Sequence, residues 1–287
     1  MTAQQSAPPK RCCIVVANDE RSERLSASLH QGVSSTRPSA AVSGGFLRLA
    51  ARRARKLASP ANVLVCAKEA DRLAWQGPFW FTRPANRFIS DRDTPTSLST
   101  AGAVLSIAAK DPTCLIAVLP SDFWVARESV LIEAIEKGLG QMRVMPESIA
   151  TLGMIDSHHE SHEDYLVVGP NNAQKGAVIQ ARVNRPESRL AKQLITEGAM
   201  VASGILLGYA QAFAARINKY WPLLARELIH TLESDYLLDG ERSLSASSYR
   251  QIPRAVMNSV RLSPPTFPMR AFRVQGSGWC SRKVGEG

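Results

Sequence analysis

The sequence predicts an α/β fold: three α/β/α layers around a doubly wound, mainly parallel sheet. Short apolar runs, typical of strands buried on both faces, alternate with amphipathic segments over about the first 150 residues. One run, Leu115–Leu119, is ended by Pro120 and followed at once by Asp122. Ligands of open α/β sheets bind at the carboxyl ends of strands. The Asp122 carboxylate therefore either caps the next helix or holds a divalent cation against phosphate oxygens.

Composition indicates one soluble globular domain. The chain has 287 residues, of which 45% are hydrophobic and 21% charged. We expect a disordered tail at residues 1–10 and a single domain at residues 11–287. No apolar run approaches the ~20 residues of a membrane span, and the N-terminus has no signal-like core, so we expect a cytoplasmic protein and no membrane partner. The five cysteines include no CxxC pair, which fits a reducing compartment and gives no metal motif.

The chain is basic, with a formal net charge of +10 and a pI near 9.7. This charge suits a nucleotide or sugar-phosphate substrate, and also nucleic acid or acidic lipid. The basic residues are scattered except for one cluster within an expected helix, which we interpret as a solvated face. Its members are Arg48, Arg52, Arg53, Arg55 and Lys56. Nucleic acid is therefore not the expected partner.

The first half of the domain, residues 11–150, reads as strands alternating with helices. The expected strands are Cys12–Ala17, Asn62–Cys66, Trp80–Thr82, Leu115–Leu119 and Ile149–Met154. Helical spacing of apolar residues predicts helices over 45–58, 69–75, 97–109 and 128–139. The polar segment between Arg83 and Thr96 is expected to be a loop.

The pattern changes in the second half, residues 151–287, where shorter strands surround several helices. The expected strands are Tyr165–Gly169, Ala177–Val183, Ile205–Leu207 and Met269–Val274. The expected helices are Ser188–Glu197, Ala210–Asn218, Trp221–Leu232 and one beginning near Leu244 in the segment Leu244–Asn258. Gly198 stands where a C-capping glycine is usual.

Seven short segments, in order along residues 11–282, resemble motifs of the sugar-nucleotide pyrophosphorylases, most closely the mannose-1-phosphate guanylyltransferases. They are Asp91-Arg92-Asp93-Thr94, Leu119-Pro120-Ser121-Asp122, Ala150-Thr151-Leu152-Gly153, Asp164-Tyr165, Val183-Asn184-Arg185-Pro186-Glu187, Ser203-Gly204-Ile205-Leu206 and Gly276-Ser277-Gly278-Trp279. The resemblance implies a Rossmann-like nucleotidyltransferase fold of the GT-A kind. Residues 11–150 would be the nucleotide-binding half and residues 151–287 the sugar-phosphate-binding half.

The resemblance also implies a reaction and the residues that perform it. A nucleoside triphosphate, GTP in the closest relatives, and a sugar 1-phosphate would form a nucleotide sugar such as GDP-mannose, with Mg²⁺ as cofactor. The implied catalytic residues are Arg24, Asp122 and Arg185, with Asp122 as the metal ligand. The implied nucleotide-binding residues are Arg24, Arg37, Arg92, Asp93 and Thr94. The implied sugar-phosphate-binding residues are Tyr165, Arg185 and Ser203.

The sequence departs from the family pattern at chemically important positions. The family's glycine-rich phosphate loop corresponds to Asn18–Leu25, which keeps Arg24 but has no glycine, so side chains would crowd the phosphates. Arg37 stands near the family's lysine, and Ala202 replaces a sugar-contacting asparagine. Ser281 stands where the second metal aspartate is expected. The alternative is therefore a catalytically inactive relative that acts as a nucleotide-binding or protein-interaction module.

Two further groups of residues admit a functional interpretation. His158 and His162 have the i, i+4 spacing of a helical metal site, with acidic residues around them, but no helical pattern flanks them and a solvated polar loop is favoured. Trp75, Trp80 and Trp124 flank apolar runs, and we expect them in the core and not on a base-stacking platform.

Overall fold

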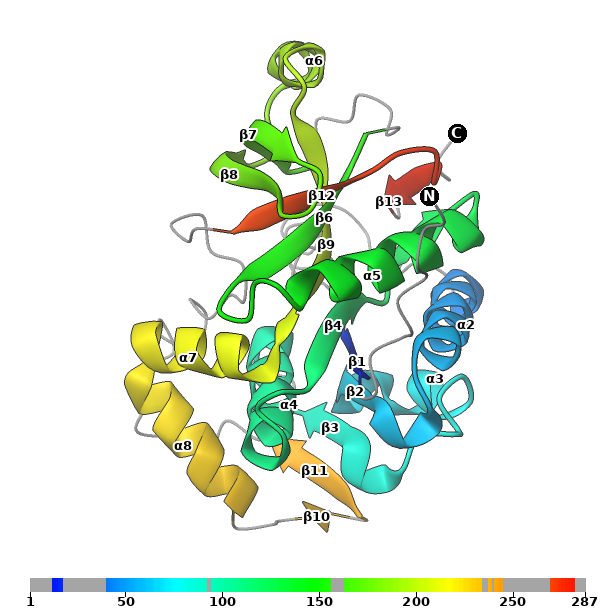
Figure 1. Cartoon of the computed structure of the whole chain (residues 1–287). Helices are drawn as coiled ribbons and strands as arrows, with labels where there is room; N and C mark the ends of the chain where they lie inside the picture. Colours follow the sequence, from blue (N-terminus) through cyan, green and yellow to red (C-terminus); the bar gives the residue numbers. More distant parts are fainter. Residues whose placement is uncertain are drawn as a thin grey trace, which may run out of the picture.

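The structure, a computed structural model, describes residues 12–17, 40–91, 94–155, 163–233, 237–238, 240–244 and 269–281. Figure 1 shows helices arranged on both sides of a long twisted sheet. Among the described residues, no helix has both the length and the apolar character needed to cross a membrane. The tail predicted for residues 1–10 lies outside the described residues.

Four parallel strands form the centre of the first half. They are β1 (Cys12–Ala17), β2 (Val63–Lys68), β3 (Arg87–Ser90) and β4 (Leu115–Pro120), in the spatial order β3-β2-β1-β4. Helical connections link them along the chain, as parallel pairing requires. The pairing of β1 with β4 ends with Ala17 opposite Pro120, so both strands finish at one edge of the sheet. The structure therefore confirms the Rossmann-like arrangement of this half.

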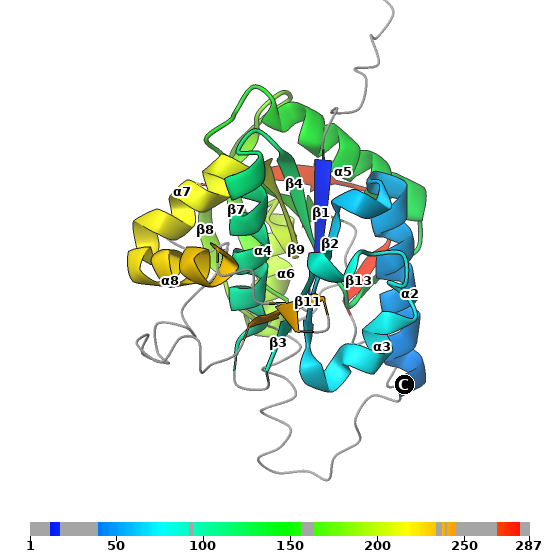
Figure 2. The same ribbon diagram turned by 90° about the horizontal axis from the view of Figure 1, so that it is seen from below.

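Helices cover both faces of these strands (Figure 2). One face carries α2 (Ala40–Leu57), α3 (Arg72–Gln76) and α5 (Glu128–Met142), and the other carries α4 (Thr96–Lys110), α7 (Ala210–Tyr220) and α8 (Pro222–Glu233). Strand β1 shows why two cores form. Ile14 and Val16 pack toward α2 and α5, whereas Val15 and Ala17 pack toward α4 and α8. Successive side chains of a strand point to opposite faces, so an unbroken apolar run serves both cores.

The second half of the sheet is mostly antiparallel. Strand β9 (Met200–Tyr209) pairs antiparallel with both β4 and β6 (Ile149–Met154), whereas β12 (Arg270–Val274) runs parallel to β6. The hairpin of β7 (Tyr165–Asn172) and β8 (Gly176–Val183) joins β12 on one side and pairs back with β9 on the other. These five strands therefore close into a ring. The expectation of a mainly parallel sheet is wrong here. Strands β7 and β8 run antiparallel because a tight turn joins them, and β9 runs antiparallel to β4, β6 and β7.

The third strand lies later in the chain than the sequence predicts. The segment Trp80–Thr82 is a turn and not a strand, and the Thr82 N–H donates to the Phe79 carbonyl at 3.0 Å. Strand β3 lies inside the segment expected to be a loop. Asn86, directly before it, donates its side-chain amide to the Val63 carbonyl at 3.1 Å, which aligns the start of β3 with β2.

The far edge of the sheet is completed by β11 (Glu241–Leu244), which pairs parallel with β3. Leu244 ends this strand and does not begin a helix, and the rest of the predicted helix lies outside the described residues. Glu241 is buried, and its carboxylate lies 2.9 Å from Arg72 and 3.0 Å from Arg87. These two ion pairs hold β11 at the edge of the sheet. The remaining helix is α6 (Ser188–Thr196), and the short elements are β5 (Phe123–Val125), β10 (Leu237–Leu238), β13 (Trp279–Ser281) and 3-10 turns at Pro60–Asn62, Glu69–Asp71 and Pro84–Asn86.

The predictions for the core residues are confirmed in part. Cys12, Cys66 and Cys114 are buried, as expected for small apolar residues. Trp75 is buried too, and its ring stacks on Phe79 with centroids 5.1 Å apart. The expectation is wrong for the other two tryptophans: Trp80 is 70% exposed and Trp124 is 46% exposed. Both lie in short segments where one face is open to solvent.

Candidate functional site

Asp122 lies at the carboxyl edge of the central strands. It follows β4 directly, and it precedes β5. The N–H of the neighbouring Ser121 donates to the carbonyl of Ala17 at 2.9 Å, which joins the ends of β1 and β4. The Asp122 side chain is half-buried. A carboxylate is thus held at the edge where α/β folds bind their ligands.

The short pairing of β5 with β13 brings the Ser281 position close to Asp122. Ser281 lies opposite Phe123, the residue after Asp122. The close contact between these two strands depends on Gly278, directly before β13. Gly278 has a positive φ of 59°, and an added Cβ there would lie 2.7 Å from the Cβ of Ala126. The tertiary structure therefore joins the two positions that the resemblance assigns to metal ligands, although only one of them carries a carboxylate.

A buried arginine supports β5 from beneath. Arg53 of α2 is 2% exposed and forms two hydrogen bonds to the Glu128 carboxylate, at 2.9 and 2.7 Å. It also donates to the Phe123 carbonyl at 3.0 Å, and its guanidinium lies 4.1 Å from the centroid of the Phe123 ring. The interpretation of the basic cluster on α2 as a solvated face is wrong for Arg53. It is the exception: Arg48, Arg52, Arg55 and Lys56 are exposed.

The residues that the resemblance assigns to the sugar phosphate lie in different environments. Tyr165 of β7 is fully buried. Ser203 of β9 is buried, and its hydroxyl donates to the Leu152 carbonyl at 2.7 Å. Arg185 is exposed, has a positive φ of 42°, and lies in the connection between β8 and α6. No hydrogen bond or ion pair between described residues joins Arg185 to Asp122.

Of the residues assigned to the nucleotide, only Thr94 can be described. Arg24, Arg37, Arg92 and Asp93 lie outside the described residues. Thr94 is fully buried, and its N–H donates to Asp91 Oδ1 at 2.8 Å. Its own Oγ1 is buried, and no described residue forms a hydrogen bond with it. Thr94 precedes the first turn of α4, where the N-cap residue, Pro95, makes no side-chain capping hydrogen bond. Such an uncapped terminus offers N–H groups and a partial positive charge to an anion.

His158 and His162 lie outside the described residues. The acidic residues that follow them are buried, and Asp164 forms an ion pair with Arg182 at 2.6 Å. Among the described residues, no group of three or more histidine, cysteine or acidic side chains could hold a metal ion. At the edge of the sheet where Asp122 lies, a magnesium ion would be coordinated by Asp122, by water and by substrate phosphates, a ligand set that this ion tolerates.

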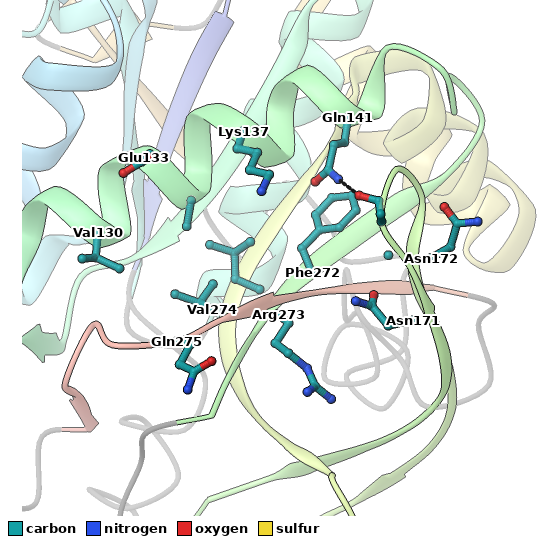
Figure 3. Close-up of a pocket in the computed structure, with 14 residues that line it drawn as sticks. Val130, Glu133, Lys137, Gln141, Asn171, Asn172, Phe272, Arg273, Val274 and Gln275 are labelled. Carbon is teal, nitrogen blue, oxygen red and sulfur yellow. Dashed lines mark hydrogen bonds between the residues drawn. The ribbon is translucent and has the colours of Figure 1, made fainter. Parts of the chain in front are cut away.

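A groove of about 250 Å³ lies elsewhere, between α5 and the segment of β12 that faces the β7–β8 hairpin (Figure 3). None of the residues predicted for the active site lines it. At one end, the Gln141 side chain of α5 donates to the Ala173 carbonyl of the hairpin at 2.9 Å. Sequence reasoning did not identify this groove, since its walls come from three segments that are distant in the chain.

Comparison with solved structures relates the fold to known ones. A mannose-1-phosphate geranyltransferase from Thermus thermophilus superposes with a TM-score of 0.68 at 18% identity, over 94% of this chain and 76% of that one. A mannose-6-phosphate isomerase from Helicobacter pylori superposes with a TM-score of 0.64 at 13% identity, over 94% of this chain and 100% of that one. The sequence matches no protein-family model and no curated protein.

These likenesses define the class of fold. The chain shares its α/β fold, over 94% of its length, with the mannose-1-phosphate geranyltransferase and with the mannose-6-phosphate isomerase. The two neighbours carry different activities in their names, and identities of 18% and 13% establish the fold alone.

Proposed function

We propose that the chain is a nucleotidyltransferase that forms a nucleotide sugar of the GDP-mannose kind from a nucleoside triphosphate and a sugar 1-phosphate. One observation carries most of the support: Asp122 lies at the carboxyl edge of the central strands, and the β5–β13 pairing places Ser281 opposite Phe123, the residue that follows Asp122. The basic net charge of +10 suits two anionic substrates.

In the proposed reaction, an oxygen of the sugar phosphate attacks the α-phosphorus of the triphosphate. A new oxygen–phosphorus bond forms, the bond to the β-phosphate breaks, and pyrophosphate leaves. The protein neutralises charge and aligns the reacting atoms. Asp122 would hold Mg²⁺, and the ion would neutralise phosphate charge. Arg24 and the start of α4 bind the triphosphate, and Arg185 orients the sugar phosphate.

The test is pyrophosphate release from GTP and mannose 1-phosphate in the presence of Mg²⁺. Asp122→Asn should lower the rate at least hundredfold, the usual effect of removing one group that stabilises developing charge. Asp71→Asn is the matched control, because Asp71 is an exposed carboxylate that makes no side-chain cap. Equal rates in wild type and Asp122→Asn would reject the assignment of Asp122.

A second candidate is a relative that binds nucleotide or a protein partner without turnover. It is favoured by Ser281, which has no carboxylate at the second metal position, and by Ser203, whose hydroxyl is already bonded to the main chain. Thermal-shift titration with GTP and with GDP-mannose separates the two candidates. Stabilisation without pyrophosphate release would support this binding role, and turnover would reject it.

A further inference from the structure

The two most exposed large apolar side chains of the described residues lie on α3 and on the turn that follows it. Leu73 is 84% exposed and Trp80 is 70% exposed. Two main-chain hydrogen bonds continue the helical path of α3 through this turn: the Phe79 N–H donates to the Trp75 carbonyl at 3.0 Å, and the Trp80 N–H donates to the Gly77 carbonyl at 3.4 Å. Leu73 and Trp80 have the i, i+7 spacing of one helix face, whereas Trp75 and Phe79 pack into the core. The outer face of this segment is therefore apolar.

The neighbouring helix α2 presents a face that carries only positive charge. Four exposed cations recur there at the spacing of one helix face: Arg48, Arg52, Arg55 and Lys56. None of the four forms an ion pair with another described residue, and α2 contains no aspartate or glutamate. The acidic residues nearest to Leu73 along the chain are Glu69 and Asp71, before α3, and Glu69 lies 3.5 Å from Arg72. The positive field of α2 is therefore left for an anionic partner.

Two ring contacts join the basic face of α2 to the apolar face of α3. The Arg55 guanidinium lies 5.5 Å from the centroid of the Phe81 ring. The Phe81 ring in turn meets the Trp80 ring edge to face, with centroids 6.3 Å apart. Figures 1 and 2 both show α2 and α3 together on the right-hand edge of the molecule. The cations and the apolar side chains therefore form one surface, the α2–α3 face, which consists of Arg48, Arg52, Arg55, Lys56, Leu73 and Trp80.

We propose that the α2–α3 face binds the surface of an anionic lipid membrane. Each cation held near such a surface tightens binding about fivefold, and tryptophan and leucine side chains enter the boundary between headgroups and acyl chains. Binding of this kind needs no membrane-spanning helix.

The apolar part of the face favours lipid over nucleic acid. A single-stranded nucleic acid stacks its bases on several aromatic rings in succession. Among the described residues of this face, Trp80 is the one exposed ring, since Phe81 is half-buried and lies against Arg55. The aliphatic Leu73 side chain offers no ring to a base, but it can enter a lipid surface. The proposal does not depend on whether the chain transfers nucleotides.

The experiment is co-sedimentation of the full chain with two kinds of vesicle, one of phosphatidylcholine alone and one of phosphatidylcholine mixed with phosphatidylserine. Binding to the mixed vesicles should be at least tenfold tighter than to the neutral ones, because about four cations face the surface. Raising the salt concentration should weaken it, since salt screens exposed charges. A single-stranded oligonucleotide, titrated under the same conditions, provides the comparison with nucleic acid.

Two double variants separate the charged from the apolar contribution. Arg48→Gln with Arg52→Gln should weaken binding to the mixed vesicles at least tenfold. Its control is Arg189→Gln with Lys192→Gln on α6, which changes the net charge equally at exposed positions.

Leu73→Ala with Trp80→Ala should also weaken binding at least tenfold, because it removes the side chains that enter the lipid. Its control is Tyr220→Ala with Leu223→Ala, an exposed aromatic and leucine at α7 and α8, which lie on the left-hand edge of the molecule in both views.

Four results would each overturn the proposal. They are no binding to the mixed vesicles, equal binding to the neutral vesicles, control variants that lose as much affinity as the variants of the α2–α3 face, and face variants that lose affinity for the oligonucleotide but not for the vesicles. The last result would assign the face to nucleic acid.

Discussion

Replacing Arg53 with methionine should destabilise the fold more than any other single change in the basic cluster of α2. Arg53 makes three hydrogen bonds, two to Glu128 and one to the Phe123 carbonyl, and stacks on the Phe123 ring. Breaking a fully buried ion pair typically costs about 3–5 kcal/mol, because a charge is left without a partner. The Glu128 side chain is 27% exposed and can be partly rehydrated, so we expect the lower end, about 3 kcal/mol.

Urea unfolding followed by circular dichroism measures this loss. A loss of about 3 kcal/mol corresponds to a Tm lower by roughly 6–10 °C for a domain of this size. Arg52→Met is the matched control, since Arg52 is exposed on the same helix, and its effect should stay within about 0.5 kcal/mol. A double-mutant cycle with Glu128→Gln should give a coupling energy above about 1 kcal/mol. If Arg53→Met were as stable as Arg52→Met, the argument that Arg53 anchors β5 would be refuted.

Three other predictions follow from single positions. Glu241→Ala should cost about 3 kcal/mol of unfolding free energy in urea, because it removes the buried carboxylate that Arg72 and Arg87 share at the sheet edge, and a loss below about 1 kcal/mol would contradict this. Burial raises the pKa of the Cys66 thiol to about 12, so the folded chain keeps its proton while the unfolded chain ionises from about pH 8.5. The protonated Cys66 thiol contributes its full share of stability below about pH 8.5, and this share falls as the pH rises toward 12. Between about pH 7.5 and 10, the free energy of unfolding of the wild type should therefore fall by about 2 kcal/mol more than that of Cys66→Ala. Ser281→Asp should tighten Mg²⁺ binding about tenfold by calorimetry, because it adds a carboxylate next to the Asp122 loop; unchanged binding in that variant would argue against a shared metal site.

The central strands could be predicted from the sequence because their signal is local. Unbroken apolar runs indicate β1 and β4, and the proline after the second run marks the edge where Asp122 lies. Strand β9 is predicted only at Ile205–Leu207, although it spans ten residues, because Ser203 and Gly204 interrupt the apolar pattern. The buried Ser203 hydroxyl is satisfied by a carbonyl of the neighbouring strand, and this compensation cannot be read from the chain alone.

The features that complete the candidate site depend on contacts between distant segments. The pairing of β5 with β13 involves three residues on each side, too short for any periodic signal. The burial of Arg53 is equally hard to predict from the sequence, because Arg53 differs from its neighbour Arg52 only in the face of α2 on which it lies. The groove arises because β12 leaves β8 after two paired residues, a geometric event without a sequence motif.

We expect the edge at Asp122 to bind a magnesium–nucleotide complex. Calorimetric titration of GTP in the presence of Mg²⁺ tests it directly, with wild type and Asp122→Asn measured side by side. We expect binding by the wild-type chain that weakens at least tenfold in Asp122→Asn or when the metal is removed with a chelator. Affinity that is the same in both chains, with and without metal, or an absence of binding by the wild type, would contradict the account.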